Sequence, residues 1–171
     1  MDCLIHAPPE YQRYFVEPEG VEHYRLLEQL TSDMDGQIVV DVGTLYGLSA
    51  FAMSRNPNVE VWTYDIQSFI PDNAPIKKRP NISFRIKNGI EAIPDFVDKT
   101  TLIMLDIDPH DGTQERQFID ALVEHKYTGQ VVCDDIHLND AMKMFWDSVT
   151  QRKEVRKDGH HSGTGIIYFE C

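Results

Sequence analysis

Short apolar runs alternate with amphipathic segments along most of the chain. Apolar runs rich in β-branched residues predict strands at 37–42, 59–66, 82–88, 101–108 and 129–136. Apolar residues at helical spacing predict helices at 21–32, 48–55, 89–96, 114–125 and 140–151. Strands that alternate with helices are typical of an α/β fold, in which helices flank a mostly parallel sheet.

The two ends of the chain depart from this alternation. Residues 1–20 hold three prolines among aromatic residues, which predicts an irregular arm. The segments 153–158 and 163–170 flank a polar turn and predict an antiparallel closure of the sheet. The length of 171 residues fits a single domain, in which 1–32 form an N-terminal arm and helix and 33–171 form the core.

Charge and cysteine content narrow the class of partner and the compartment. Acidic residues outnumber basic ones by 28 to 16, which disfavours nucleic acid and anionic membrane surfaces as partners. The three cysteines form no closely spaced pair, so neither a disulfide framework nor a zinc site is indicated. The N-terminus lacks the apolar core of a secretory signal, and no apolar run is long enough to span a bilayer. We therefore expect a cytoplasmic protein.

A glycine-bearing turn, DVGTLYGLSA, follows the first predicted strand. The spacing of Gly43 and Gly47 differs from the dinucleotide-binding and Walker A patterns, so the turn alone is equally compatible with a connection that binds no ligand. Asp65 ends the second predicted strand about 20 residues further on, where an acid can accept hydrogen bonds from ribose hydroxyls. Together the two features favour a nucleoside-containing ligand.

Two acid-rich segments follow the fourth and fifth predicted strands. LDIDPHDG carries Asp106, Asp108 and His110, and CDDIH carries Asp134 and Asp135. Because neighbouring parallel strands end at one edge of a sheet, these carboxylates would converge and repel one another unless a cation lies among them. An all-oxygen donor set suits Mg²⁺ or Ca²⁺ rather than zinc. The alternative is that the acids cap the following helices, which accounts for one acid per strand.

The glycine turn resembles motif I of class I S-adenosylmethionine-dependent methyltransferases. The similarity is greatest to the metal-dependent sugar O-methyltransferases of the macrocin and novobiocin type, and more distant to catechol O-methyltransferases. This resemblance implies a Rossmann-like fold with a mostly parallel seven-stranded sheet and an antiparallel C-terminal strand. It also implies S-adenosylmethionine as the cofactor. The residues that would bind it are Asp41, Gly43, Thr44, Leu45, Gly47, Ser49, Asp65, Ile66, Asn88, Gly89 and Asp106.

The same resemblance assigns roles within the acid-rich segments. It implies that Mg²⁺, or another divalent cation, binds Asp106, Asp134 and Asp135. The LDID stretch matches a segment that supplies the general base in the sugar enzymes, which makes Asp108 a candidate catalytic base. His110 lies in the same loop and titrates nearer neutrality, so it is an alternative base. The catechol enzymes have a lysine in this loop, and this chain has none there.

Further polar and aromatic residues are candidates for the acceptor site. They are His137, Asn139, His160 and Tyr14. His137 is equally suited to pairing with a neighbouring carboxylate, and a polar surface turn is the favoured interpretation of the loop that holds His160. Tyr11, Tyr14 and Phe15 offer stacking surface for a sugar ring, with core packing as the alternative.

The function implied by the resemblance is Mg²⁺-dependent methylation of a sugar hydroxyl. A deoxyhexose such as rhamnose, free or within a glycan, is the expected acceptor. The alternatives are methylation of a catechol or other phenol, and a methyltransferase-like module that binds ligands without turnover. The chain is short for this family and has little N-terminal lid, which would suit a large glycan in an open cleft or a homo-oligomer whose second subunit supplies the lid.

Overall fold

A seven-stranded sheet organises the computed structural model, which describes residues 2–170. The strands are β1 (Ile38–Val42), β2 (Glu60–Asp65), β3 (Ile82–Ile86), β4 (Thr100–Leu105), β5 (Gly129–Cys133), β6 (Arg152–Arg156) and β7 (Thr164–Phe169). Their order across the sheet is β3-β2-β1-β4-β5-β7-β6. Strand β7 is antiparallel to both of its neighbours, and every other adjacent pair is parallel. The predicted sheet, with its antiparallel C-terminal strand, is confirmed.

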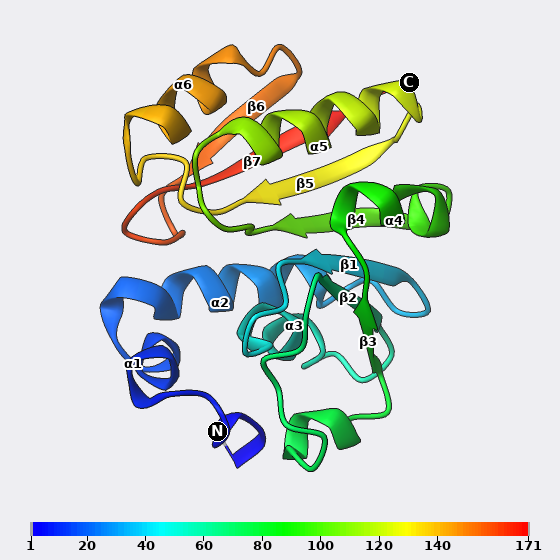
Figure 1. Cartoon of the computed structure of the whole chain (residues 1–171), viewed down its shortest axis with the longest axis vertical. Helices are drawn as coiled ribbons and strands as arrows, with labels where there is room; N and C mark the ends of the chain where they lie inside the picture. Colours follow the sequence, from blue (N-terminus) through cyan, green and yellow to red (C-terminus); the bar gives the residue numbers. More distant parts are fainter. Residues whose placement is uncertain (1, 171) are drawn as a thin grey trace.

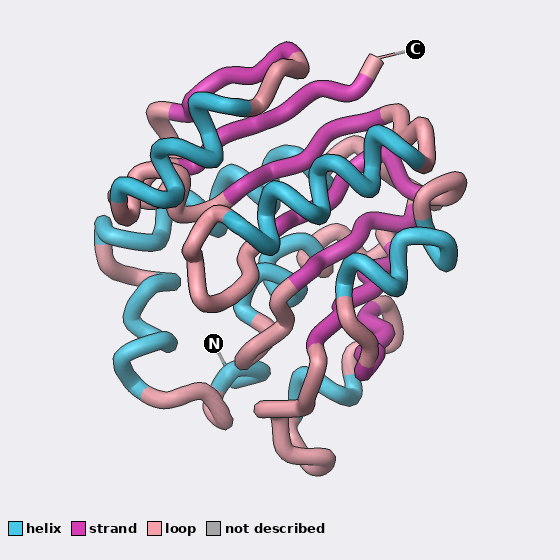
Figure 2. Tube along the Cα trace, turned by 45° about the horizontal axis from the view of Figure 1, so that its top comes forward, coloured by secondary structure: helices cyan, strands magenta, loops and turns pink. Residues whose placement is uncertain are grey.

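Helices cover both faces of the sheet (Figures 1 and 2). One face packs against α4 (Gly89–Phe96), α5 (Thr113–Glu124) and α6 (Asp140–Ser148), and the other against α2 (Pro18–Thr31) and α3 (Leu48–Met53). On β4, Ile103 faces the first layer, and Leu102 and Met104 face the second. Because the central strands are buried on both faces, they appear in the sequence as continuous apolar runs.

The N-terminal segment is more regular than the predicted irregular arm at 1–20. Helix α1 (Pro9–Gln12) lies between short 3-10 turns at Asp2–Leu4 and Arg13–Phe15, and α2 begins at Pro18 instead of residue 21. Proline suits the first turn of a helix because its φ is preset and its missing N–H would have no partner there. Residues 1 and 171, which the predicted domain includes, lie outside the described residues.

Strands β4 and β5 end earlier than predicted, and this changes the position of the acids. The Asp106 N–H donates to the Val42 carbonyl at 2.9 Å, and the Asp134 N–H donates to the Leu105 carbonyl at 3.1 Å. These are the last bonds that the ends of β4 and β5 make to their parallel neighbours. The acids therefore lie in loops beyond the strands, where the alternation of strand faces no longer decides their direction.

Two smaller features complete the fold. A 3-10 turn at Pro75–Lys78 was not predicted, and α6 ends at Ser148 instead of residue 151. The Lys153 side chain accounts for the earlier end, because its ammonium group donates to the carbonyls of Trp146 and Val149 in the final turn. Among residues 2–170, no helix combines the length and the apolar character needed to cross a membrane.

The fully buried Ile103 on the central strand β4 should contribute strongly to stability. We expect Ile103→Ala to lower the free energy of unfolding by about 2–5 kcal/mol, because it removes buried methyl groups and leaves a cavity. Met144→Ala on α6 is the control, since Met144 is exposed and should change stability by less than about 0.5 kcal/mol. Denaturant unfolding measures both, and equal losses would contradict this account of the core.

Candidate functional site

A pocket of about 410 Å³ opens at the carboxyl ends of the parallel strands. It lies beside β1, whose neighbours in the sheet are β2 on one side and β4 on the other. The strand order changes direction at β1, and ligands bind at this position in open α/β sheets. The predicted site residues that line it are Tyr14, Gly43, Thr44, Leu45, Ser49, Asp65, Ile66, Asn88, Gly89, Asp106, Asp108, His110, Asp134, Asp135 and His160. The fold thus brings the glycine turn and the acid-rich segments into one pocket.

Four predicted site residues do not line this pocket, and each has a different place. Asp41 is buried beneath the glycine turn, and Gly47 caps α3 with φ +80° while packing against Ile76. Asn139 caps α6 by accepting the Met142 N–H, and its amide donates to the His110 carbonyl. His137 is exposed outside the pocket. Asn139 therefore holds the His110 loop in place, and the proposed acceptor contacts at 137 and 139 are not part of the described pocket.

The glycine turn is pressed against the end of β4. Gly43 has φ +105°, and a Cβ built there would lie 1.6 Å from the Asp106 carbonyl oxygen. The Leu45 N–H donates to the Asp65 carboxylate at 2.9 Å, so Asp65 both shapes the turn and faces the pocket. Only glycine fits at position 43, because the two backbones approach too closely for any side chain.

A buried polar chain supports the turn from below. The Thr63 hydroxyl donates to Asp41 at 2.6 Å, and the hydroxyls of Thr44 and Thr63 lie 2.5 Å apart. Burial raises the pKa of Asp41 to about 7, although the hydrogen bond from Thr63 lowers it. Asp41 is thus placed to stabilise the turn. It is buried beneath the turn and does not line the pocket, although the resemblance implied that it binds the cofactor.

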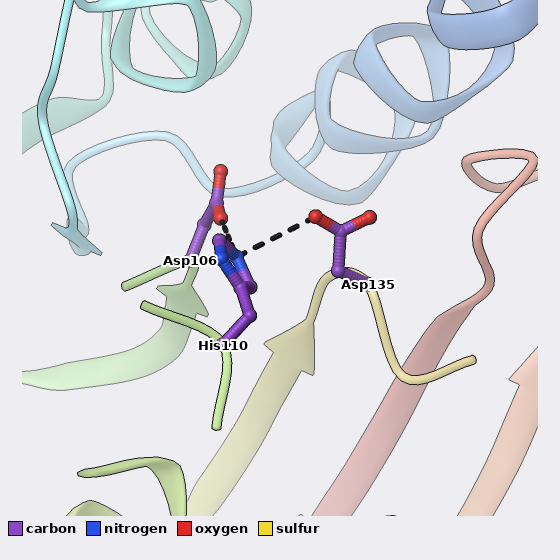
Figure 3. Close-up of side chains that lie close together, drawn as sticks. All are labelled: Asp106, His110 and Asp135. Carbon is purple, nitrogen blue, oxygen red and sulfur yellow. Dashed lines mark hydrogen bonds and ion pairs between the residues drawn. The ribbon is translucent and has the colours of Figure 1, made fainter. Parts of the chain in front are cut away.

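His110 lies between two carboxylates from different loops (Figure 3). Its Nε2 is 3.0 Å from Asp106 Oδ1 and 3.4 Å from Asp135 Oδ2, and its Nδ1 is 3.2 Å from Asp108 Oδ1. His110 and Asp135 both adopt left-handed backbone conformations, with φ of +55° and +56°. Such conformations cost energy outside glycine and occur frequently at functional sites.

A second histidine lies on the other side of Asp135. His160 Nδ1 is 3.2 Å from Asp135 Oδ1 and 3.4 Å from Asp134 Oδ2. The Ser162 hydroxyl contacts both His160 and Asp135, and the Thr164 hydroxyl donates to Asp134. The loop that holds His160 was interpreted as a polar surface turn. That interpretation is wrong for His160, because β7 pairs with β5 and carries the loop back to the acids.

His23 from α2 also reaches the acids, although no sequence pattern distinguished it. It is buried, and its Nδ1 lies 3.2 Å from the Thr164 hydroxyl and 3.7 Å from Asp134 Oδ1. The contact joins residues that are more than one hundred positions apart in the sequence, so local periodicity cannot predict it. The N-terminal helix therefore supports the same group of acids as the strand ends.

The histidines offset the charge of the acids. Burial would raise the pKa of Asp134, but His23 and His160 outweigh burial and lower it to about 2. Burial would lower the pKa of His110 and of His160, but hydrogen bonds and attraction from the carboxylates raise these values to about 9 and about 10. Burial raises the pKa of Asp106 despite its hydrogen bond from His110. Attraction between the histidines and the carboxylates thus offsets the repulsion among the acids.

These residues fit a divalent cation. Asp106, His110 and Asp135 offer ligand atoms within 4.8 Å of one another, and so do Asp134, Asp135 and His160. The sequence predicted carboxylate ligands alone, whereas the structure adds an imidazole to each group of donors. The histidines were missed as donors because their distance from the acids depends on how two loops fold back over the strand ends.

Aromatic residues from the N-terminal segment also line the pocket. Tyr11 packs edge-on against Tyr46 with ring centroids 4.8 Å apart, and Tyr14 packs against His160 at 5.8 Å. Phe15, which was also a candidate for stacking, lies outside the pocket and stacks on Tyr24 instead. Tyr11 and Tyr14 therefore remain candidates for ligand contact, and Phe15 has the packing role that was its alternative.

Gly43→Ala should destabilise the protein severely, because its Cβ would collide with the Asp106 backbone. We expect the free energy of unfolding to fall by more than about 3 kcal/mol. Gly36→Ala is the matched control: Gly36 has φ +75° but nothing within 4 Å of its Cβ position, so only about 1–2 kcal/mol should be lost. Denaturant unfolding of both variants tests this, and equal losses would show that the Asp106 contact is not the constraint.

Asp41 should add a pH-dependent contribution to stability. Its pKa in the folded chain is about 7, above about 4 for an exposed aspartate, so the unfolded chain releases the proton first as pH rises. Stability is therefore lost between about pH 4 and pH 7 and changes no further above that range. In Asp41→Asn this loss is absent, so the variant should gain stability relative to the wild type across the range. Denaturant unfolding at about pH 4 and pH 7 measures the difference in unfolding free energy between Asp41→Asn and the wild type. A difference that is the same at both pH values would contradict the prediction.

The comparisons with known proteins agree with this architecture. No protein-family model matches the sequence, and no curated protein matches it significantly. The crystal structure of a Staphylococcus aureus protein assigned as a caffeoyl-CoA O-methyltransferase is similar with a TM-score of 0.68 at 15% identity, covering 86% of this chain and 82% of that one. The SAH-bound methyltransferase PaMTH1 of Podospora anserina is similar with a TM-score of 0.67 at 15% identity, covering 100% and 89%.

A third structure leads to the same conclusion. The O-methyltransferase TomG of Streptomyces achromogenes, in complex with SAM and involved in tomaymycin synthesis, is similar with a TM-score of 0.68 at 13% identity, covering 100% of this chain and 91% of that one. Identities this low establish the fold alone. The chain has the Rossmann-like fold of these methyltransferases, as the resemblance of its glycine turn implied.

Proposed function

We propose that the chain is an S-adenosylmethionine-dependent O-methyltransferase that methylates a sugar hydroxyl with a divalent cation bound at its acids. One observation carries the proposal: a single pocket extends from Asp65 and Asn88 beyond β2 and β3 to the acids beyond β4 and β5. A nucleoside at one end and an acceptor hydroxyl at the other would then meet over the glycine turn.

The half of the pocket near β2 and β3 suits the cofactor. Asp65 ends β2 and can accept hydrogen bonds from ribose hydroxyls. Exposed Ile66 offers an apolar surface beside it, and Gly89 opens α4 after Asn88, which caps the helix by accepting the N–H groups of Ile90 and Glu91. The neighbours PaMTH1 and TomG contain SAH and SAM respectively, which supports the choice of cofactor.

The half near β4 and β5 suits the methyl acceptor. A divalent cation at the acids would hold adjacent hydroxyls and lower the pKa of one of them. The acceptor oxygen forms a bond to the methyl carbon as the bond from that carbon to sulfur breaks, and the hydroxyl proton passes to a base. Holding two reactants in line can supply about 7–11 kcal/mol of the rate enhancement.

Asp108 is the better placed of the two candidate bases. Its side chain is 84% exposed at the pocket, whereas the His110 side chain is 13% exposed and in contact with three carboxylates. Both ring nitrogens of His110 face carboxylates, so neither is directed at an acceptor hydroxyl. We therefore assign proton acceptance to Asp108 and its orientation to His110, 3.2 Å away.

The pocket and its loops favour a sugar as acceptor. Tyr11 and Tyr14 present aromatic surface in the same pocket as the acids, which suits the face of a sugar ring. The loop from Asp106 to Gly112 contains no lysine, in contrast with the catechol enzymes that the sequence resembles. A catechol also carries adjacent hydroxyls on a stackable ring, so phenols are the necessary comparison in a substrate panel.

Cofactor binding is the first test. Calorimetric titration with S-adenosylmethionine should show binding by the wild type, and Asp65→Ala should weaken it about 10–100-fold, the value of hydrogen bonds to a charged group. Asp65→Asn keeps an acceptor for the Leu45 N–H and separates loss of the ribose contact from loss of the turn. Asp98→Ala, at an exposed position outside the pocket, is the control. No binding by the wild type with or without Mg²⁺ would overturn the proposal.

Methyl transfer to acceptors is the second part of the test. Labelled methyl groups should appear on a rhamnose-containing glycoside and not on catechol, and Asp108→Asn should lower turnover about 10²–10⁴-fold while cofactor binding is retained. Transfer to catechol alone would identify the acceptor as a phenol instead of a sugar. Full activity of Asp108→Asn would remove Asp108 as the base.

A further inference from the structure

The acids at the ends of β4 and β5 share their space with two imidazoles. Asp135 is the central group, because its Oδ2 lies 3.4 Å from His110 Nε2 and its Oδ1 lies 3.2 Å from His160 Nδ1. Asp106 completes the group on the His110 side, and Asp134 completes it on the His160 side. A cation among these residues would meet nitrogen donors as well as oxygen donors.

We propose that this centre is a mixed nitrogen and oxygen site that binds a divalent first-row transition-metal ion in preference to Mg²⁺, with His110 and His160 among its ligands. The inference rests on the proposed function for the use of the metal, but its binding can be tested independently. It names a class of metal different from the Mg²⁺ that the acid-rich segments alone predicted.

The spacing of the donor atoms supports shared ligation. Two neighbouring ligands of an octahedral ion with bonds of about 2.1 Å lie about 3.0 Å apart. His110 Nε2 lies 3.0 Å from Asp106 and 3.4 Å from Asp135, and His160 Nδ1 lies 3.2 Å and 3.4 Å from Asp135 and Asp134. The atoms thus already stand near the separations of adjacent ligands, and a small closure would complete the coordination.

Donor chemistry then selects among cations. Mg²⁺ is a hard ion that takes oxygen ligands and retains water, so an imidazole adds little to its binding. Imidazole suits iron, nickel, copper and zinc, and the affinity of such sites for divalent first-row ions increases from manganese to copper. Replacing carboxylate-only coordination by coordination with one or two imidazoles therefore shifts the preference away from Mg²⁺.

The backbone at both histidines is held by hydrogen bonds from neighbouring segments. The Asn139 amide donates to the His110 carbonyl, and the backbone N–H of His160 donates to the Thr164 hydroxyl at 2.8 Å. These contacts fix the two loops, so His110 and His160 stand beside the acids as the loops fold.

The test uses the full chain after EDTA treatment, with Mn²⁺ as the probe. Electron paramagnetic resonance should show Mn²⁺ bound and retained against a tenfold excess of Mg²⁺, and electron spin echo spectra should show ¹⁴N coupling from imidazole. His110→Gln and His160→Gln should each weaken Mn²⁺ binding about 10–100-fold and leave Mg²⁺ binding unchanged. His125→Gln, an exposed histidine at the far end of α5, should behave as the wild type.

The inference is overturned if equal Mg²⁺ displaces Mn²⁺, if the bound Mn²⁺ shows no ¹⁴N coupling, or if both variants bind Mn²⁺ as the wild type does. Should a variant fail to fold, the wild-type ¹⁴N coupling still decides the ligation. S-adenosylmethionine calorimetry on the same samples separates the two proposals. Cofactor binding without ¹⁴N coupling overturns the nitrogen ligands alone, and ¹⁴N coupling without cofactor binding overturns the proposed function alone.

Discussion

The repulsion among Asp106, Asp134 and Asp135 is the constraint on which the rest of the site depends. Three carboxylates meet at the ends of β4 and β5, where burial removes much of the solvent that would screen them. The chain offsets them with His110 and His160, each from a loop that folds back over the strand ends. Positive charge at this edge of the sheet, from protons or from a metal ion, is therefore a condition for the observed arrangement.

The same edge of the sheet joins the two halves of the pocket. Gly43 lets the glycine turn rest on the backbone of Asp106, so the proposed cofactor side and the acids share one wall. Asp65 and Asp41 fix the turn from two directions, one at the pocket and one beneath it. A displacement of the turn would therefore move the acid at the end of β4 as well, which links the geometry of ligand binding to that of the reaction site.

The alternation of elements was predictable because each central strand is buried on both faces and each helix has one apolar side. The boundaries of the elements were harder to predict, as β4 shows. Its apolar run continues into Ile107, but its hydrogen-bonded ladder ends where the Asp106 N–H donates to the Val42 carbonyl. Proline-rich residues 1–20 were predicted as irregular, because the sequence alone does not distinguish a proline that starts a helix from one that interrupts it.

The sheet, the glycine turn and the acids at two strand ends could all be predicted from the residues, because local periodicity indicates the elements and ligands gather at the carboxyl ends of parallel strands. The approach of His23 and His160 to those acids depends on the packing of the layers, and so does the position of His137 outside the pocket. Such contacts join α2 and the β6–β7 loop to β5 across the sheet edge. Their distances are set by how the layers pack, and no spacing along the chain records them.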